Sequence, residues 1–203
     1  MESDALKLFG RWEYIVEVKD IGLKRYINLN PRYIPITHGK FANKQFGKAN
    51  VNVVERMANK MMRSGQGAKK MVGKYLRGRG NTGNKLNALN VIKTAFEIIE
   101  KRTKKNPIQV LVNALQNTGP AEETTSIIYG GIKYHQAIDA SALRRLDFAL
   151  KNLALGAFAT SFNTKNTLGE ALANEIVLAA NNDTKSFAVS RKEETERIAA
   201  SSR

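Results

Sequence analysis

The chain has 203 residues, of which 42% are hydrophobic, and this is enough for one domain with a substantial core. Its formal net charge of +15 predicts a polyanionic partner, either nucleic acid or an anionic membrane. The lack of cysteine excludes disulfides and thiolate chemistry, and no apolar run of about eighteen residues could span a bilayer. The first residues lack the layout of a signal peptide, so a cytoplasmic location is expected.

The positive charge is concentrated in one part of the chain. Residues 51–105 carry fourteen basic and three acidic residues, whereas residues 106–203 carry ten of each. No acidic residue occurs from Arg56 to Phe96. The ten basic residues of that interval are Arg56, Lys60, Arg63, Lys69, Lys70, Lys74, Arg77, Arg79, Lys85 and Lys93. Solvated helices usually alternate the sign of their charges, so this acid-free stretch predicts a surface that binds phosphate.

RNA suits this stretch better than duplex DNA or a membrane. No pair of helices typical of groove recognition is evident, whereas flexible basic loops and exposed tyrosines suit irregular RNA. The helix that carries Arg56, Lys60 and Arg63 also lacks the bulky aromatic residues of an interfacial helix. We therefore expect no membrane partner.

Two segments are predicted, an N-terminal arm at 1–50 and a helical RNA-binding domain at 51–203. Within the arm, the alternation of WEYIVEV at 12–18 predicts a short strand. The rest of the arm contains Pro31, Pro35 and several glycines, and it is expected to be extended with little core of its own.

Helical periodicity begins at Val51. The inward stripe of the first helix is Val54, Met57, Ala58 and Met61. Its opposite face carries Arg56, Lys60 and Arg63, which are expected to be exposed. Inward positions of later helices are Leu89, Ile92, Phe96 and Ile99, then Ile108, Leu111 and Leu115, then Leu143, Leu146, Leu150, Leu153 and Ala157.

Local signals mark where the other elements begin and end. Residues 64–85 are basic and rich in glycine, and they are expected to form a short helix and then a loop. Helix starts are predicted at Asn106 with Pro107, at Ser141, at Thr167 with Glu170, and at Ser190 with Glu193. The chain therefore predicts a mainly α fold, a bundle of about six helices with one protruding β-hairpin and an extended N-terminal arm.

The β-hairpin is predicted at residues 124–139, TTSIIYGGIKYHQAID. Gly130 and Gly131 supply the positive φ angles of a two-residue turn, which pairs Tyr129 with Ile132, Ile127 with Tyr134 and Thr125 with Gln136. One face is then apolar and aromatic, and the other carries Ser126, Lys133 and His135 beside Ile128. An isolated hairpin is only marginally stable in water, so this ribbon needs support from the rest of the molecule or from a partner.

The sequence contains only weak candidates for a catalytic or metal site. Residues 78–83, GRGNTG, fit the glycine pattern of a dinucleotide site, but a basic segment precedes them and no second strand with an acid follows. His38 and His135 lie far apart in the chain and lack nearby acids at metal-ligand spacing. We predict no enzyme activity, no cofactor, no metal and no small-molecule substrate.

Several longer motifs resemble a known family, the small-subunit ribosomal protein family numbered seven, in its archaeal and eukaryotic branch. The matching pieces are NVVERMANKMMR at 52–63, NVIKTAFEIIEKRTKKNP at 90–107, NPIQVLVNA at 106–114, the GP-x-EE turn at 119–123, the Gly-Gly ribbon, QAID at 136–139, Arg144 with Arg145, and KSFAV…KEETERIA at 185–199. The sequence departs from the family pattern at Ala121, Ala142 and Ser190, where that pattern often has arginine, proline and a basic residue.

The resemblance implies a mainly helical protein that binds the 3′ major domain of 16S rRNA and nucleates assembly of the 30S head. Implied partners are other small-subunit proteins of the head and platform, and tRNA and mRNA near the exit site of the ribosome. Implied rRNA-binding residues are the ten cations of 56–93 together with Arg144 and Arg145. Implied ribbon residues on the side of mRNA and exit tRNA are Tyr129, Gly130, Gly131, Lys133, Tyr134 and His135.

Alternatives remain open at this point. The two ribbon tyrosines could stack on RNA or could stabilise the hairpin by cross-strand packing. The protein could instead be a free-standing RNA-binding protein or an RNA-modifying enzyme, and the last of these requires a pocket with convergent polar groups.

Overall fold

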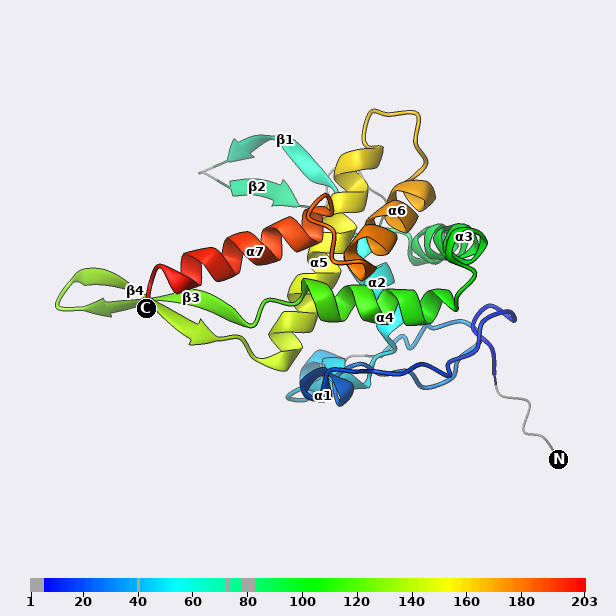
Figure 1. Cartoon of the computed structure of the whole chain (residues 1–203), viewed down its shortest axis with the longest axis horizontal. Helices are drawn as coiled ribbons and strands as arrows, with labels where there is room; N and C mark the ends of the chain where they lie inside the picture. Colours follow the sequence, from blue (N-terminus) through cyan, green and yellow to red (C-terminus); the bar gives the residue numbers. More distant parts are fainter. Residues whose placement is uncertain (1–5, 40, 72–73, 78–82) are drawn as a thin grey trace.

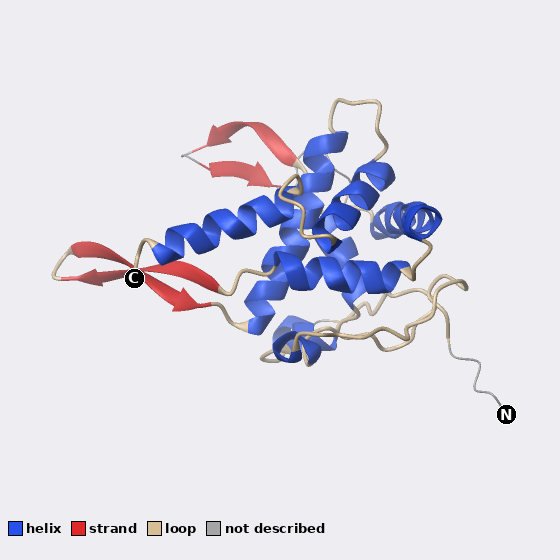
Figure 2. Cartoon of the chain, in the orientation of Figure 1, coloured by secondary structure: helices blue, strands red, loops and turns tan. Residues whose placement is uncertain are grey.

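The computed structural model describes residues 6–39, 41–71, 74–77 and 83–203 (Figures 1 and 2). Its helices are α1 Ile21–Lys24, α2 Val53–Met61, α3 Lys85–Thr103, α4 Pro107–Thr118, α5 Ala142–Ser161, α6 Leu168–Ala180 and α7 Phe187–Ala200, with short 3-10 turns at Phe41–Asn43 and Gly47–Asn50. Its strands are β1 Gln66–Met71, β2 Lys74–Arg77, β3 Glu122–Tyr129 and β4 Ile132–Asp139. The predicted mainly helical fold with a protruding hairpin is confirmed. Within the described ranges no helix is long and apolar enough to cross a membrane.

The helices enclose one hydrophobic core. α6 packs against α3, α4 and α5, while α2 packs against α3 and α5. The apolar stripe predicted for α2 is buried, as are the predicted inward residues of α3 and α4. On α5 the same holds from Leu146 to Ala157, whereas Leu143 is only partly buried. Periodicity therefore identified the faces that the hydrophobic effect removes from water.

The segment 12–18 is extended but is not a strand, so that prediction is wrong. Its burial does alternate, and Trp12 packs edge-on against Phe96 with ring centroids 5.6 Å apart. Trp12 forms an isolated bridge with Leu8, and Glu17 is held by a side chain of α4 instead of a neighbouring strand. Gln109 accepts from the N–H of Glu17 at 2.8 Å and donates to its carbonyl at 2.9 Å. These amide contacts fasten the arm onto the helical core.

Residues 66–71 and 74–77 form an antiparallel strand pair, so the prediction of a short helix is wrong. β1 and β2 pair Lys70 with Tyr75 and Met71 with Lys74, with an irregularity between Gln66 and Lys70. A helix here would contain Gly67 and Gly73, each costing about 1 kcal/mol relative to alanine, whereas the antiparallel pair gives the backbone hydrogen bonds without that cost. Figure 1 shows this hairpin projecting from the helical bundle.

Helix starts follow the predicted caps at Asn106 and Thr167. Asn106 accepts from the N–H of Ile108 at 3.0 Å, and Thr167 and Glu170 form a reciprocal capping box. Ser141 stands at the start of α5, although its side chain makes no capping hydrogen bond.

The last helix begins earlier than the predicted pair Ser190 and Glu193. Ser186 is the N-cap of α7, and its hydroxyl accepts from the N–H of Val189 at 3.3 Å. The same hydroxyl donates to the buried Glu175 of α6 at 2.7 Å, and Glu175 also accepts from the N–H of Ala188 at 2.9 Å. A tertiary partner from α6 therefore decides where this helix starts.

The predicted register of the ribbon is confirmed, with Tyr129 opposite Ile132, Ile127 opposite Tyr134 and Thr125 opposite Gln136. Gly130 and Gly131 adopt φ angles of +56° and +82°, as the tight turn requires.

The C-terminal end of α7 lies across the base of this ribbon (Figure 1). Glu196 accepts from the N–H of Ala121 at 2.9 Å, and Arg203 forms an ion pair with Glu122. The carbonyl of Ser202 accepts from the N–H of Ala137. The base of the ribbon is thus anchored by a helix distant in sequence, while its outer half extends beyond the helices.

Candidate nucleic-acid interface

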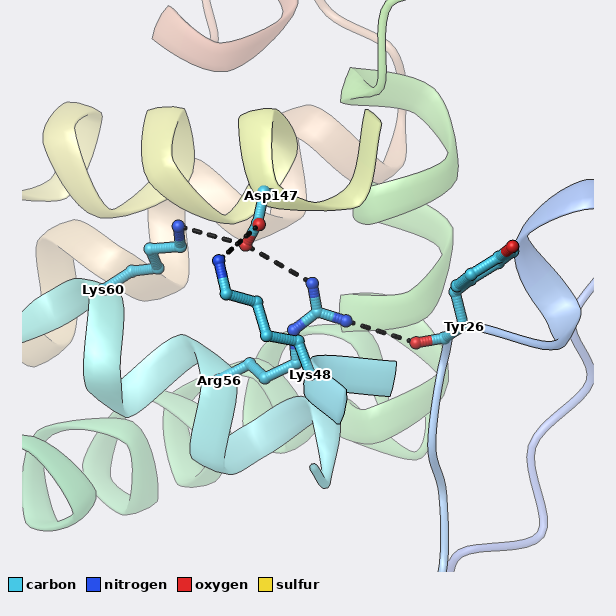
Figure 3. A network of polar contacts seen from close by, with 5 residues as sticks. All are labelled: Tyr26, Lys48, Arg56, Lys60 and Asp147. Carbon is cyan, nitrogen blue, oxygen red and sulfur yellow. Dashed lines mark hydrogen bonds and ion pairs between the residues drawn. The ribbon is translucent and has the colours of Figure 1, made fainter. Parts of the chain in front are cut away.

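Arg56 is buried, which corrects the expectation that it is exposed. Only 5% of its surface is accessible, because α5 and the N-terminal arm cover α2 around this residue, whereas Lys60 and Arg63 farther along the same face stay accessible. Its guanidinium donates to the carbonyl of Tyr26 at 3.2 Å and to Asp147 at 3.3 Å (Figure 3). Burial lowers the pKa of Arg56, and the charge of Asp147 opposes that shift. Arg56 therefore joins the arm, α2 and α5, and it is a structural cation.

Asp147 gathers three cations from two parts of the chain. Its carboxylate lies 3.1 Å from Lys60, 3.3 Å from Arg56 and 3.4 Å from Lys48 (Figure 3). Partial burial by itself raises the pKa of Asp147, but Lys60, Arg56 and Lys48 together bring it below the ordinary value. Sequence analysis did not identify Asp147, because nothing local distinguishes it from other acids on amphipathic helices.

Glu55, the neighbour of Arg56, makes a second buried connection. It is 1% exposed, and its Oε1 accepts from the N–H and the hydroxyl of Thr37 at 3.1 and 3.0 Å. The same oxygen accepts from Lys85 at the start of α3. Lys85 is therefore already paired with an acid, although a quarter of its side chain is still accessible.

The cations that face solvent near α2 come from three segments. Lys48 lies in the second 3-10 turn, and Lys60 lies in the last turn of α2, with Arg63 two residues beyond its end. Lys151 lies on α5, one turn after Asp147. Lys60, Arg63 and Lys151 line one surface hollow, and Lys48, Lys60 and Arg63 line the next. We call these four residues the α2–α5 cationic surface. Sequence analysis selected Lys60 and Arg63 for it but missed Lys48 and Lys151, because both lie outside the acid-free stretch from Arg56 to Phe96.

The β1–β2 hairpin carries further candidate residues. Lys69 and Lys70 lie on β1, and Lys74 and Arg77 lie on β2. β1 begins five residues after the end of α2. Arg79 and most of the glycine motif at 78–83 lie outside the described residues. Lys93 is exposed on α3.

Arg144 and Arg145 lie elsewhere, near the base of the ribbon. Arg144 is two-thirds exposed and pairs with Glu123 of β3. Arg145 is 3.2 Å from Asp20, and its Nε is buried without a hydrogen-bond partner. The structure therefore does not bring this pair into the α2–α5 cationic surface, and Arg145 has a structural contact with the N-cap of α1.

The ribbon presents its large side chains to solvent. Tyr129 is 79% and Tyr134 is 52% exposed, and both lie on the face that also carries Ile127 and Ile132. On the other face, His135 lies 3.3 Å from the hydroxyl of Ser126, next to the exposed Lys133. Aromatic rings held this far from the core are available as stacking surfaces for bases.

A helical core with a cationic surface and a projecting aromatic ribbon is typical of proteins that bind RNA. The sequence matches the family described as ribosomal protein S7p/S5e over residues 23–203. It is also 47% identical over 202 residues to small ribosomal subunit protein uS7 of Archaeoglobus fulgidus, a match that covers 99% of this chain and 97% of that protein. The chain belongs to the ribosomal protein S7p/S5e family, which confirms the resemblance seen in its motifs.

Arg56 and Arg63 differ in burial, so the same substitution at each position has different consequences. Arg56→Gln leaves Asp147 with weaker pairing in a covered site, and we expect a loss of about 3 kcal/mol in the free energy of unfolding. Arg63→Gln, on an exposed side chain, is expected to change that free energy by less than about 0.5 kcal/mol. Urea denaturation of both variants measures the difference. Equal stabilities would show that the buried contacts of Arg56 contribute nothing.

The lowered pKa of Asp147 predicts a pH dependence of stability. Because the folded-state pKa lies below the ordinary value of 3.8, ionised Asp147 stabilises the fold above about pH 4, and this contribution is lost as the pH falls through the folded-state pKa. Asp147→Asn should therefore be destabilising at pH 7, and its deficit relative to the natural protein should shrink toward pH 3. Urea denaturation across this range tests the trend, with the exposed Asp139→Asn as a control. A deficit that is constant with pH would contradict it.

Proposed function

We propose that this protein is a non-enzymatic, structural component of the small ribosomal subunit. In this proposal it binds the 3′ major domain of 16S rRNA and nucleates assembly of the subunit head. One observation carries the proposal: Lys48, Lys60, Arg63 and Lys151 come from three separate segments and meet on one surface. Family membership and the printed name of the relative from Archaeoglobus fulgidus support the ribosomal assignment.

Phosphate binding by this surface follows from its electrostatics. Asp147 holds Lys48 and Lys60 within 3.4 Å and so limits the freedom of two flexible side chains. Holding them in advance lowers the entropy cost of ordering them on a ligand. The β1–β2 hairpin follows α2 in the chain and carries Lys69, Lys70, Lys74 and Arg77, and we assign these cations to further phosphate contacts.

The ribbon has a separate role in the proposal. Its tip carries Tyr129 and Tyr134 away from the helical core, where they can stack on RNA bases. We assign this part of the molecule to contacts with exit-site tRNA and mRNA, and to other small-subunit proteins of the head and platform.

The first test is the salt dependence of rRNA binding. If about six cations contact phosphates, log K should fall against log salt with a slope of about −4 to −5. Replacing one cation of the α2–α5 cationic surface, Arg63→Gln, should reduce the magnitude of that slope by about one. The affinity of the purified protein for an rRNA fragment of the head is measured from low to moderate salt. An affinity that does not change with salt would contradict phosphate binding.

The second test separates the ribbon from the core. Residues 127–134 are replaced by a short glycine-rich turn, and the fold is expected to stay cooperative because these side chains are largely exposed. Primary rRNA binding should survive, whereas subunits reconstituted with the variant should hold exit-site tRNA abnormally. Thermal melting, subunit assembly and tRNA occupancy are compared with the natural protein. Loss of folding or of head assembly would place the ribbon in the core.

A further inference from the structure

The face of α5 that carries Lys151 becomes aromatic toward the C-terminal end of the helix. From Lys151, spacings of four, three and four residues lead to Leu155, Phe158 and Phe162, and such spacings place side chains on one face of a helix. Lys151 and Leu155 line a hollow of the α2–α5 cationic surface. This surface therefore continues along α5 into two aromatic rings, at the end where the loop to α6 projects from the bundle (Figure 1).

Phe162 is the more exposed of the two aromatic residues. It is 59% exposed, whereas Phe158 is partly buried and packs against it with ring centroids 5.3 Å apart and planes tilted by 31°. The N–H of Phe162 donates to the carbonyl of Phe158 at 2.9 Å, and the next residue, Asn163, has a left-handed φ of +57° where the chain leaves the helix. These contacts hold Phe162 in place while more than half of its surface stays accessible to a ligand.

Single apolar residues at a protein surface need no functional explanation, but these two rings lie between cations. Lys151 precedes Phe158 by about 10 Å along the helix axis, a distance that a short single strand of RNA can span. On the other side, Lys165 is exposed in the loop three residues after Phe162. An apolar protein segment that covered the rings would also have to remove these charges from water, which is costly without paired acids. A ligand with flat unsaturated rings and closely spaced negative charges suits both features.

We propose that Phe162, supported by Phe158, stacks on an unpaired base of RNA whose phosphates lie along Arg63 and Lys151. Aromatic side chains stack on every kind of base, but only where the base is not already enclosed between its neighbours in a duplex. The site is therefore selective for single-stranded over duplex RNA and not for a particular base. This inference rests on the proposed RNA-binding function and assigns an unpaired segment of RNA to the α5 end of the cationic surface.

The first test compares a labelled oligoadenylate with an RNA duplex of the same length, by fluorescence anisotropy with the full-length protein. Phe162→Leu keeps an apolar side chain against Phe158 but lacks a ring, and it should weaken binding of the oligoadenylate about tenfold. Binding of the duplex should change by less than about twofold, because its bases offer few free faces. Phe162→Tyr keeps the ring and should bind both RNAs as the natural protein does.

Salt dependence separates stacking from charge. Because the ring of Phe162 is neutral, Phe162→Leu should leave the slope of log K against log salt for the oligoadenylate unchanged. Arg63→Gln should reduce the magnitude of that slope by about 0.7, the value for one phosphate contact on a single strand. A slope that changes equally in both variants would show that Phe162→Leu disturbs the cationic surface, and would overturn the assignment of a stacking role.

Tyr33→Leu is the matched control. Tyr33 is 56% exposed and lies in the N-terminal arm, so this change removes a ring of similar exposure that does not line the hollows of the cationic surface. Binding of the oligoadenylate should be unaffected, and thermal melting establishes that each variant is folded. A loss as large as that of Phe162→Leu would mean that any exposed ring contributes, which would overturn the site.

Photocrosslinking tests the site in the natural protein and does not depend on the folding of any variant. The protein is irradiated with an oligouridylate, digested and analysed by mass spectrometry. The peptide that contains Phe162 should carry a uridine nucleotide. Crosslinks confined to other peptides, including that of the ribbon tyrosines, would place stacking elsewhere and overturn the inference.

The outcomes also separate this inference from the proposed function. If Phe162→Leu binds the oligoadenylate as the natural protein does, while rRNA binding keeps its salt dependence, the stacking site is overturned and the proposed function stands. If the variant binds both RNAs normally but enters reconstituted subunits poorly, the rings contact a protein and the stacking site is again overturned. Failure of the natural protein to bind the rRNA fragment and the oligoadenylate would overturn both proposals.

Discussion

The contact between Arg56 and Asp147 is the constraint on which the arrangement of this protein depends. It joins α2 to α5 across 91 residues of sequence, and Arg56 also holds the carbonyl of Tyr26 in the arm. A buried guanidinium needs a paired charge and filled hydrogen bonds, so the three segments must meet at this point. The adjacent Glu55 imposes a matching condition on the other side of α2, where it holds Thr37 and Lys85.

The same carboxylate shapes the proposed RNA surface. Asp147 neutralises part of the local charge, yet it draws Lys48 and Lys60 into one place and leaves Arg63 and Lys151 beside them. The surface is therefore less positive than the sequence suggests, but it is better ordered. Order and charge contribute differently, since attraction sets the salt dependence of binding whereas prior ordering reduces the entropy cost.

The ribbon differs from this surface in how it is supported by the rest of the fold. Its base is anchored by Glu196 of α7 and by Ser202 and Arg203, which follow that helix, whereas the side chains of its tip are exposed. A fold of this kind can keep its stability in the helices while the projecting strands carry exposed aromatic rings. Under the proposed function, changes at Tyr129 or Tyr134 would therefore alter binding with small effects on folding.

The sequence by itself determined the features that depend on neighbouring residues. Helical spacing identified the buried stripe of α2, the Gly130–Gly131 turn determined the ribbon register, and Asn106 and Thr167 marked helix starts. The tertiary structure decided whatever depended on a distant partner. Gln109 replaced a partner strand for residues 12–18, Glu175 moved the start of α7 to Ser186, and Asp147 turned Arg56 from a surface cation into a buried one. A sequence pattern reflects the free energies of interactions between neighbouring residues. The burial of a polar face depends instead on which remote element covers it.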